Sequence, residues 1–388
     1  MLTRRERLMR TVRGEPVDRP AVSFYEIGGW RGNPDDPDPF NVFNDPSWRP
    51  LLDLAEAETD LIRMVSAGAS PIPGIDRSRF FKWDEWTEGG RRFARQTVTA
   101  AGPKSGPVPG RTLTSLRRRD PELNTWWEIE HLLKGVEDLE AYLELPDEYF
   151  AQEPDIAPLL AAEKEVGDRG IVMVDCGDPI AHSALLFPMA EFTIIALTEP
   201  KLFHRLLEKH ARHVHVATEK VAKAFPGHLW RICGPELATE PYLPPRLFEE
   251  YVVRYTRPMV EAINRHGGVA RIHCHGRIRS ALPHFVAMGA GGTDPIEPPP
   301  QGDVDLGWVR REFGRELILF GNIEIAELEY MEPPAFERRV AQALRDGTSG
   351  PGRGFVLHPS ACPCGRTITP RTMKNYETMV RLAKAFGG

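Results

Sequence analysis

From about residue 135 onward, short apolar runs alternate strictly with longer stretches in which apolar residues recur at helical spacing. Such alternation is typical of a parallel sheet whose strands are joined by helices. The strands expected in this part cover residues 171–175, 229–234, 269–274, 292–297, 317–323 and 354–358. The helices expected between and after them cover 152–166, 189–223, 245–266, 277–288, 304–314, 333–346 and 370–386.

The N-terminal part adds two strands, at 21–25 and 60–65, with helices expected at 3–14 and 46–58. Eight strands, each followed by helical sequence, predict an α/β protein folded as a (β/α)8 TIM barrel. The alternative is an open doubly wound sheet, which would need a glycine-rich first turn. Neither Gly-x-Gly-x-x-Gly nor a Gly-Lys-Ser/Thr phosphate loop occurs, which weighs against that fold and against nucleotide cofactors.

Residues 79–133 interrupt this rhythm with runs that alternate at period two, separated by turns rich in glycine and proline. This pattern predicts a β-hairpin insertion after the second strand. We expect it to form a lid or a wall of the pocket. The whole chain, 1–388, is then one domain that includes the N-terminal helix and the insertion.

Charge and cysteine content narrow the class of protein. The 388 residues carry a formal net charge of -6, which argues against nucleic acid or an anionic membrane as partner. No apolar stretch approaches the roughly 20 residues that span a bilayer. The five cysteines lack disulfide-framework spacing, and no apolar region follows the N-terminal charges, so we expect a cytoplasmic protein.

Every cysteine lies at or just past the end of an expected strand, where the ligand sites of parallel α/β proteins are found. In His273-Cys274-His275 the side chains alternate, so the two imidazoles should face the barrel axis while Cys274 packs outward. Two histidines and one thiolate would satisfy a catalytic zinc ion with one open position. The alternative is a hydrogen-bonded histidine pair that binds no metal.

The thiol for such a zinc ion would come from Cys362 or Cys364, in the loop after the eighth strand. Pro363 extends the chain before it, and Gly365 permits a sharp turn directly after Cys364. We therefore favour Cys364 as the pocket thiol and Cys362 as its neighbour. The alternative is a buried, inert pair.

Acidic and polar residues complete the expected rim of the pocket. They are Asp175 and Asp178 after strand three, Glu236 and Glu240 after strand four, Glu297 after strand six, and Asn322 and Glu324 at strand seven. Glu236 lies within a few residues of its strand end and could orient an imidazole or act as an acid or base. We assign Glu236, Asp175 and Asn322 to catalysis, and Tyr25, Arg271 and Glu297 to substrate binding.

Five sequence motifs, in this order, resemble the uroporphyrinogen decarboxylase superfamily over nearly the whole chain. They are the segment from Arg4 to Pro20 with its Gly14-Glu15-Pro16, Gly234-Pro235-Glu236 before Tyr242, Asp294-Pro295-Ile296-Glu297-Pro298, Phe320-Gly321-Asn322-Ile323, and Thr369-Pro370 followed by Asn375. The resemblance implies a (β/α)8 barrel. The superfamily contains two classes of enzyme, metal-free decarboxylases and corrinoid-dependent methyltransferases.

Metal-free decarboxylases of this superfamily carry an Arg-x-x-Gly-Arg stretch after the first strand, where this chain has Tyr25-Glu26-Ile27-Gly28-Gly29. The chain is more similar to the corrinoid-dependent methyltransferases. Their zinc motif, His-x-Cys-Gly plus a cysteine after the eighth strand, has His275 in place of its first cysteine here. This resemblance implies zinc, and a corrinoid such as methylcobalamin either as substrate or on a partner protein.

Three functions follow as hypotheses. The first is methyl transfer to an acceptor activated at a zinc/His/Cys site, on a small-molecule substrate and with a corrinoid protein as partner; a homodimer is the association state to test. The second is a metal-free decarboxylase or lyase acting on a carboxylic acid or porphyrinogen, with Arg63, Arg231 and Arg271 as cationic candidates. The third is a non-catalytic tetrapyrrole-binding barrel.

Overall fold

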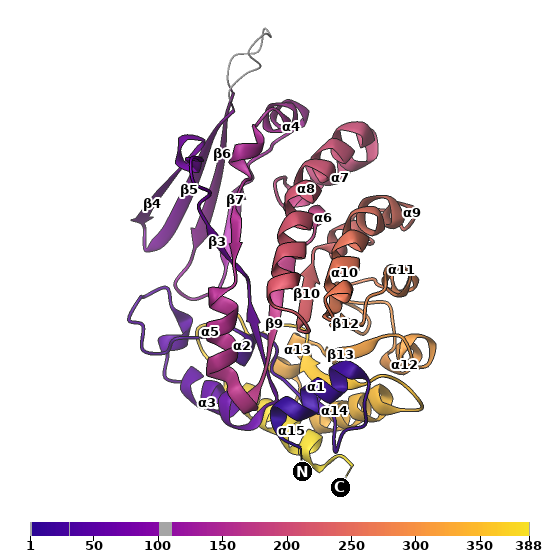
Figure 1. Ribbon diagram of the computed structural model, residues 1–388. Helices are drawn as coiled ribbons and strands as arrows, with labels where there is room; N and C mark the ends of the chain where they lie inside the picture. The colour runs from indigo at the N-terminus through magenta and orange to yellow at the C-terminus, as the bar shows by residue number, and fades with distance from the viewer. Residues whose placement is uncertain (1, 31, 101–110, 388) are drawn as a thin grey trace.

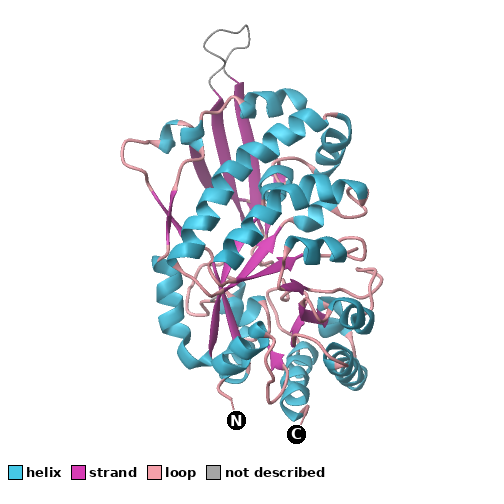
Figure 2. Ribbon diagram, turned by 45° about the vertical axis from the view of Figure 1, so that its right-hand side comes forward, coloured by secondary structure: helices cyan, strands magenta, loops and turns pink. Residues whose placement is uncertain are grey.

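The computed structural model describes residues 2–30, 32–100 and 111–387. Eight parallel strands form one curled sheet in the order β1-β14-β13-β12-β11-β10-β9-β2, with helices packed around its outside (Figures 1 and 2). The strands are β1 (Ala21–Val22), β2 (Leu61–Val65), β9 (Gly170–Gly177), β10 (Leu229–Cys233), β11 (Val269–His273), β12 (Gly292–Asp294), β13 (Ile318–Ile323) and β14 (Phe355–Pro359). All eight predicted strands are confirmed.

The principal helices are α1 (Arg4–Arg13), α3 (Trp48–Glu58), α4 (Val136–Leu143), α5 (Ala157–Val166), α6 (Pro179–Ala184), α7 (Met189–Thr198), α8 (Pro200–Ala224), α10 (Arg254–Arg265), α11 (Leu282–Met288), α12 (Leu306–Phe313), α13 (Ile325–Tyr330), α14 (Pro333–Thr348) and α15 (Pro370–Ala385). Shorter ones are α2 (Glu26–Gly29) and α9 (Arg246–Phe248). The helical region predicted at 189–223 is two helices, because Pro200 begins a new helix at its first position.

The prediction of a closed barrel is corrected at one seam, because no strand ladder joins β1 to β2 in the described residues. β1 is only two residues long, and the chain leaves extended geometry at Tyr25, which has a φ of 55°. Asp60 bridges the seam instead. Its backbone N–H donates to the Val22 carbonyl at 2.7 Å, and its carboxylate accepts from the Val22 N–H at 2.9 Å.

Alternation along the strands divides the core into two layers. Inward residues such as Ile171, Met173 and Phe320 form an apolar floor inside the curled sheet. Outward residues such as Val172 and Ile272 join the larger core beneath the helices. Because the side-chain period of a strand is two, this parity also decides which polar residues point into the interior.

The insertion after β2 is larger than the predicted hairpin. It is a four-stranded antiparallel sheet of β4 (Phe81–Glu88), β5 (Arg91–Ala100), β6 (Arg111–Arg119) and β7 (Trp126–Glu130), in that order. A two-stranded ribbon of β3 (Gly68–Ser70) and β8 (Glu153–Asp155) flanks it. Residues 101–110 of the predicted hairpin lie outside the described residues. In Figure 1 this sheet stands at the end of the molecule opposite the two termini.

Within the described ranges, no helix is both long enough and apolar enough to cross a membrane.

Candidate active site

The inward polar residues gather where the parallel strands end. In the register of the sheet, Arg231 lies between Asp175 on one side and Arg271 on the other. His273, two residues beyond Arg271 on the same face, lies between Cys233 and Asp294. Neighbouring strands are about 4.8 Å apart, so these side chains are forced into contact. We call Tyr25, Arg231, Arg271, His273, His275, Asp294, Glu297 and His358 the strand-end cluster.

Asp294 is the buried centre of this cluster. Its Oδ2 lies 2.7 Å from Nδ1 of His273, and its Oδ1 lies 2.8 Å from Nε of Arg271. Burial alone would raise the pKa of Asp294, but Arg271 and His273 outweigh it and hold that pKa below its usual range. Burial lowers the pKa of His273 to about 3. At neutral pH the group is therefore an aspartate, an arginine cation and an uncharged imidazole.

A second carboxylate–imidazole pair lies beside the first. Nδ1 of His275 is 2.9 Å from Oε1 of Glu297, whose Oε2 accepts from the Gly276 N–H at 2.7 Å. The rings of His273 and His275 are perpendicular, with centroids 4.6 Å apart. Burial lowers the pKa of His275, but Glu297 more than offsets this and the pKa lies above its usual value. Its side chain is 38% exposed, so this imidazole is accessible to a substrate.

Tyr25 lies over these residues from the end of β1. The guanidinium carbons of Arg271 and Arg231 are 5.6 Å and 5.9 Å from its ring centroid, and His358 stacks on it at 5.2 Å. Arg231 is itself paired with Asp175 at 2.7 Å. A φ of 55° is a rarely populated conformation for a tyrosine, and such local strain is concentrated at functional sites.

Several buried polar atoms of the site have no hydrogen-bond partner among the described residues. They include Nη2 of Arg271, Oδ1 of Asn322 and Nε2 of His358. The close contact between Arg271 Nε and Asp294 Oδ1 also lacks hydrogen-bond geometry, so it is an ion pair only. Unpaired buried polar groups are rare and costly in native proteins, so their concentration here indicates a place for a polar ligand or water.

Glu236 and Asp178 form an acidic neighbourhood after β10 and β9. Oε2 of Glu236 accepts from the Gly234 N–H at 3.1 Å, and burial raises the pKa of Glu236. Asp178 caps α6: it accepts from the Ala181 N–H at 2.9 Å and from the Thr256 hydroxyl at 2.8 Å. Burial raises the pKa of Asp178 to about 7, so this carboxyl titrates in the neutral range.

Asp178 should make stability depend on pH. A carboxyl whose folded pKa is raised stabilises the protein most below its unfolded pKa of about 4, and this contribution is lost as pH rises through about 7. We expect Asp178→Asn, which keeps an acceptor for the Ala181 N–H, to flatten the fall in stability between pH 4 and 7. Urea unfolding at several pH values measures this. An unchanged slope would contradict the buried, protonatable carboxyl.

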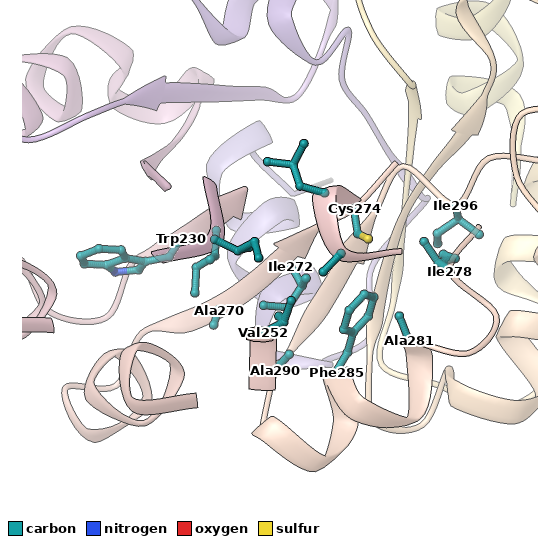
Figure 3. Close-up of a cluster of buried hydrophobic side chains, with 14 of the residues drawn as sticks. Trp230, Val252, Ala270, Ile272, Cys274, Ile278, Ala281, Phe285, Ala290 and Ile296 are labelled. Carbon is teal, nitrogen blue, oxygen red and sulfur yellow. The ribbon is translucent and has the colours of Figure 1, made fainter. Parts of the chain in front are cut away.

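The cysteines are distributed differently from the histidines. Cys274 packs outward among Ile272, Ile278 and Phe285, as Figure 3 shows, in agreement with the predicted alternation. Cys362 is partly buried against the apolar core, and its backbone N–H donates to the Glu26 carboxylate. Burial raises the pKa of the Cys362 thiol. Cys364 is exposed. No contact between either thiol and the histidines is present among the described residues, so the choice between them stays a prediction.

A zinc ion fits this arrangement only in part. The two imidazoles fit, because each binds a carboxylate through Nδ1, the arrangement that orients zinc-ligating histidines through their other nitrogen. The thiols of Cys362 and Cys364 do not fit a zinc site with these histidines. Over residues 2–30, 32–100 and 111–387, no three His, Cys, Asp or Glu side chains are grouped closely enough to hold a metal ion. In this arrangement the described residues therefore do not form a complete zinc site.

The fold brings together most of the residues selected from sequence: Tyr25, Arg271, His273, His275 and Glu297, with Asp175 joined through Arg231 and Glu236 on an adjoining turn. Asn322 lies next to His358 in the register of β13 and β14. Sequence reasoning gave no role to Asp294 or to His358. Strand parity could have found both, because each is the inward residue at the end of a strand.

Residues 129–386 match the family model described as uroporphyrinogen decarboxylase (URO-D). Among solved structures, the chain is similar to a methyltransferase from Methanosarcina mazei. The match covers 100% of each chain, with a TM-score of 0.55 and 14% sequence identity. A D-psicose 3-epimerase covers 64% of this chain and 88% of its own, with a TM-score of 0.32 and 15% identity, too low for any inference. No curated protein sequence matches.

Proposed function

We propose that this chain, which belongs to the uroporphyrinogen decarboxylase family, is a methyltransferase whose substrate site is the strand-end cluster. The structural similarity to a methyltransferase over the full length of both chains supports the proposal. At 14% identity this similarity concerns the fold. The observation that carries the proposal is the His275–Glu297 pair, an accessible imidazole with a raised pKa beside unpaired buried polar groups.

Methyl transfer to an acceptor X–H needs such a group. The X–C bond forms while the bond between the methyl carbon and its donor breaks, and the donor leaves with the electron pair. The acceptor must also lose its proton. His275 receives that proton at Nε2, and Glu297 holds the imidazole by its Nδ1–H and stabilises the imidazolium that results. His273, fixed on Asp294, stays uncharged and orients the acceptor.

The donor class implied by the sequence resemblance is a corrinoid, free or on a partner protein. To test this, the protein is mixed with methylcobalamin and a panel of thiol and phenol acceptors, and demethylation of the corrinoid is followed in the visible spectrum. We expect turnover with at least one acceptor. Bound corrinoid without turnover would favour a tetrapyrrole-binding barrel, and no spectral change with any acceptor would contradict a cobalamin donor.

Zinc binding is an alternative to proton transfer by His275, because a metal ion on Nε2 would leave that nitrogen unable to accept a proton. His273 and His275 would supply two nitrogens, and the loop containing Cys362 and Cys364 would have to move to supply a thiolate. Under this alternative, metal analysis should give about one zinc ion per chain, and His275→Ala and Cys364→Ser should each reduce it. Cys274→Ser, a buried thiol on the opposite face, is the matched control. If protein that was purified with added zinc contains none by metal analysis, this set of ligands is ruled out.

A metal-free decarboxylase is the second candidate, because Arg231 and Arg271 both point into the barrel interior beside Tyr25. Arg63, the third arginine considered from sequence, has a structural role instead. Its guanidinium donates to the Gly28 carbonyl and to Glu56 on the outer side of β2. Release of carbon dioxide from an acid substrate, without corrinoid, would favour this candidate over methyl transfer.

A further inference from the structure

A cavity of about 720 Å³ lies outside the curled sheet, between β9, the β3–β8 ribbon and α8. Its walls include the outward residues Val174, Cys176 and Trp230, so it lies on the other face of the strands from the strand-end cluster. The gap between a sheet and its helix is normally filled by side chains. A volume of this size is typical of a small-molecule site.

Three histidines line this cavity. His182 and His210 stack with ring centroids 5.9 Å apart, and His213 stacks on Phe150 at 5.2 Å. Nε2 of His210 and Nε2 of His213 are buried without a hydrogen-bond partner in the described structure, and the second of these lies 4.0 Å from a carboxylate oxygen of Asp147. His210 is 8% exposed, so its unpaired nitrogen has little access to bulk water. The ring faces of these side chains and the unpaired nitrogen of His210 suit a flat aromatic ring with a polar edge.

Burial lowers the pKa of all three imidazoles, so they are uncharged at neutral pH and add no charge to the wall of the cavity. The rim of the cavity, in contrast, carries charged side chains. Lys220 is paired with Glu153 at 2.6 Å, and Arg212 lies 3.9 Å from Asp147. Arg77, also on the rim, donates to the Tyr149 carbonyl and forms no ion pair among the described residues. The rim therefore has positive charge left for an anion.

We propose that this cavity binds a planar aromatic molecule carrying one carboxylate, with the ring against His210 and Phe150 and the carboxylate at Arg77 and Arg212. The proposal does not depend on methyl transfer, because no residue assigned to proton transfer lines the cavity. Asp175 connects the two regions, since it lines the cavity and pairs with Arg231 of the strand-end cluster.

Titration calorimetry with 2-naphthoate tests the proposal, and 2-naphthylmethylamine, a cation with the same ring, is the comparison ligand. We expect one naphthoate site with a Kd of about 0.1–1 mM, in the range of a small ligand. The amine should bind at least about tenfold more weakly. Arg212→Gln should weaken naphthoate binding by about two- to fivefold, the effect of losing one solvent-exposed charged contact.

A blocking variant locates the site. Val216 lines the cavity on α8 and is 55% exposed, so Val216→Trp should fold and obstruct the opening. Ile194→Trp, at a 52% exposed position of α7 that does not line the cavity, is the matched control. We expect Val216→Trp to lower naphthoate affinity at least about tenfold and Ile194→Trp to leave it within about twofold. No saturable naphthoate binding, equal binding of the amine, or unchanged affinity in Val216→Trp would overturn the proposal.

Discussion

Replacing Asp294 with alanine should lower the free energy of unfolding by about 3–5 kcal/mol, the range seen when one partner of a buried ion pair is removed. Asp294 is completely buried and is in contact with Arg271 and His273, which are 1% and 3% exposed. Without the carboxylate, a guanidinium remains buried beside Phe320 and Tyr25 with no counter-charge. Urea unfolding at pH 7 measures the change.

Two variants make this measurement specific. Asp168→Ala removes an exposed aspartate and should change stability by less than about 0.5 kcal/mol. Arg271→Met combined with Asp294→Leu removes both charges, and we expect it to be more stable than Asp294→Ala alone, because no unpaired charge is left. A loss below about 1 kcal/mol for Asp294→Ala would show that the ion pair is not the buried centre of the site.

Replacing His275 with glutamine should reduce kcat/KM by about 10²–10⁴-fold, the usual contribution of a positioned acid–base group. The unprotonated imidazole is the form that accepts a proton, and Glu297 raises its pKa. Activity should therefore rise with pH through a value above the usual pKa of histidine. Steady-state rates across pH 5–9 give this profile. In His275→Gln the remaining activity should no longer show that rise.

Glu297→Gln separates the chemical role of the pair from a structural one. Without the carboxylate, burial is the main influence left on His275 and it lowers the pKa, so the rise in activity should move to lower pH. A merely structural role would reduce activity without moving the profile. An unshifted profile in Glu297→Gln would mean that His275 is not the group that takes the proton.

Local sequence patterns were sufficient for the architecture and for much of the site. Strand-length apolar runs and helical spacing identified all eight parallel strands, because period and length are properties of the local chain. The same alternation placed Arg271, His273 and His275 on one face and Cys274 on the other, as the structure shows. The insertion was recognised as antiparallel β-structure, but its four strands were taken for a hairpin.

Contacts between distant residues were decided by tertiary structure. Asp294 is 21 residues from His273, and only strand pairing brings its carboxylate between Arg271 and that imidazole. The seam between β1 and β2 depends on the backbone turn at Tyr25 and on Asp60, 38 residues from Val22. The cavity beneath α8 arises from the fit of helix, sheet and ribbon, which no local pattern encodes.

The sequence by itself thus determined the order and type of the elements and the side of each strand on which polar residues lie, because both follow from backbone periodicity. Only the tertiary structure decided which charges pair, which nitrogens stay unpaired and which thiols lie away from the histidines. Those properties depend on distances of a few ångströms between residues far apart in the chain, and on how deeply packing removes each group from water.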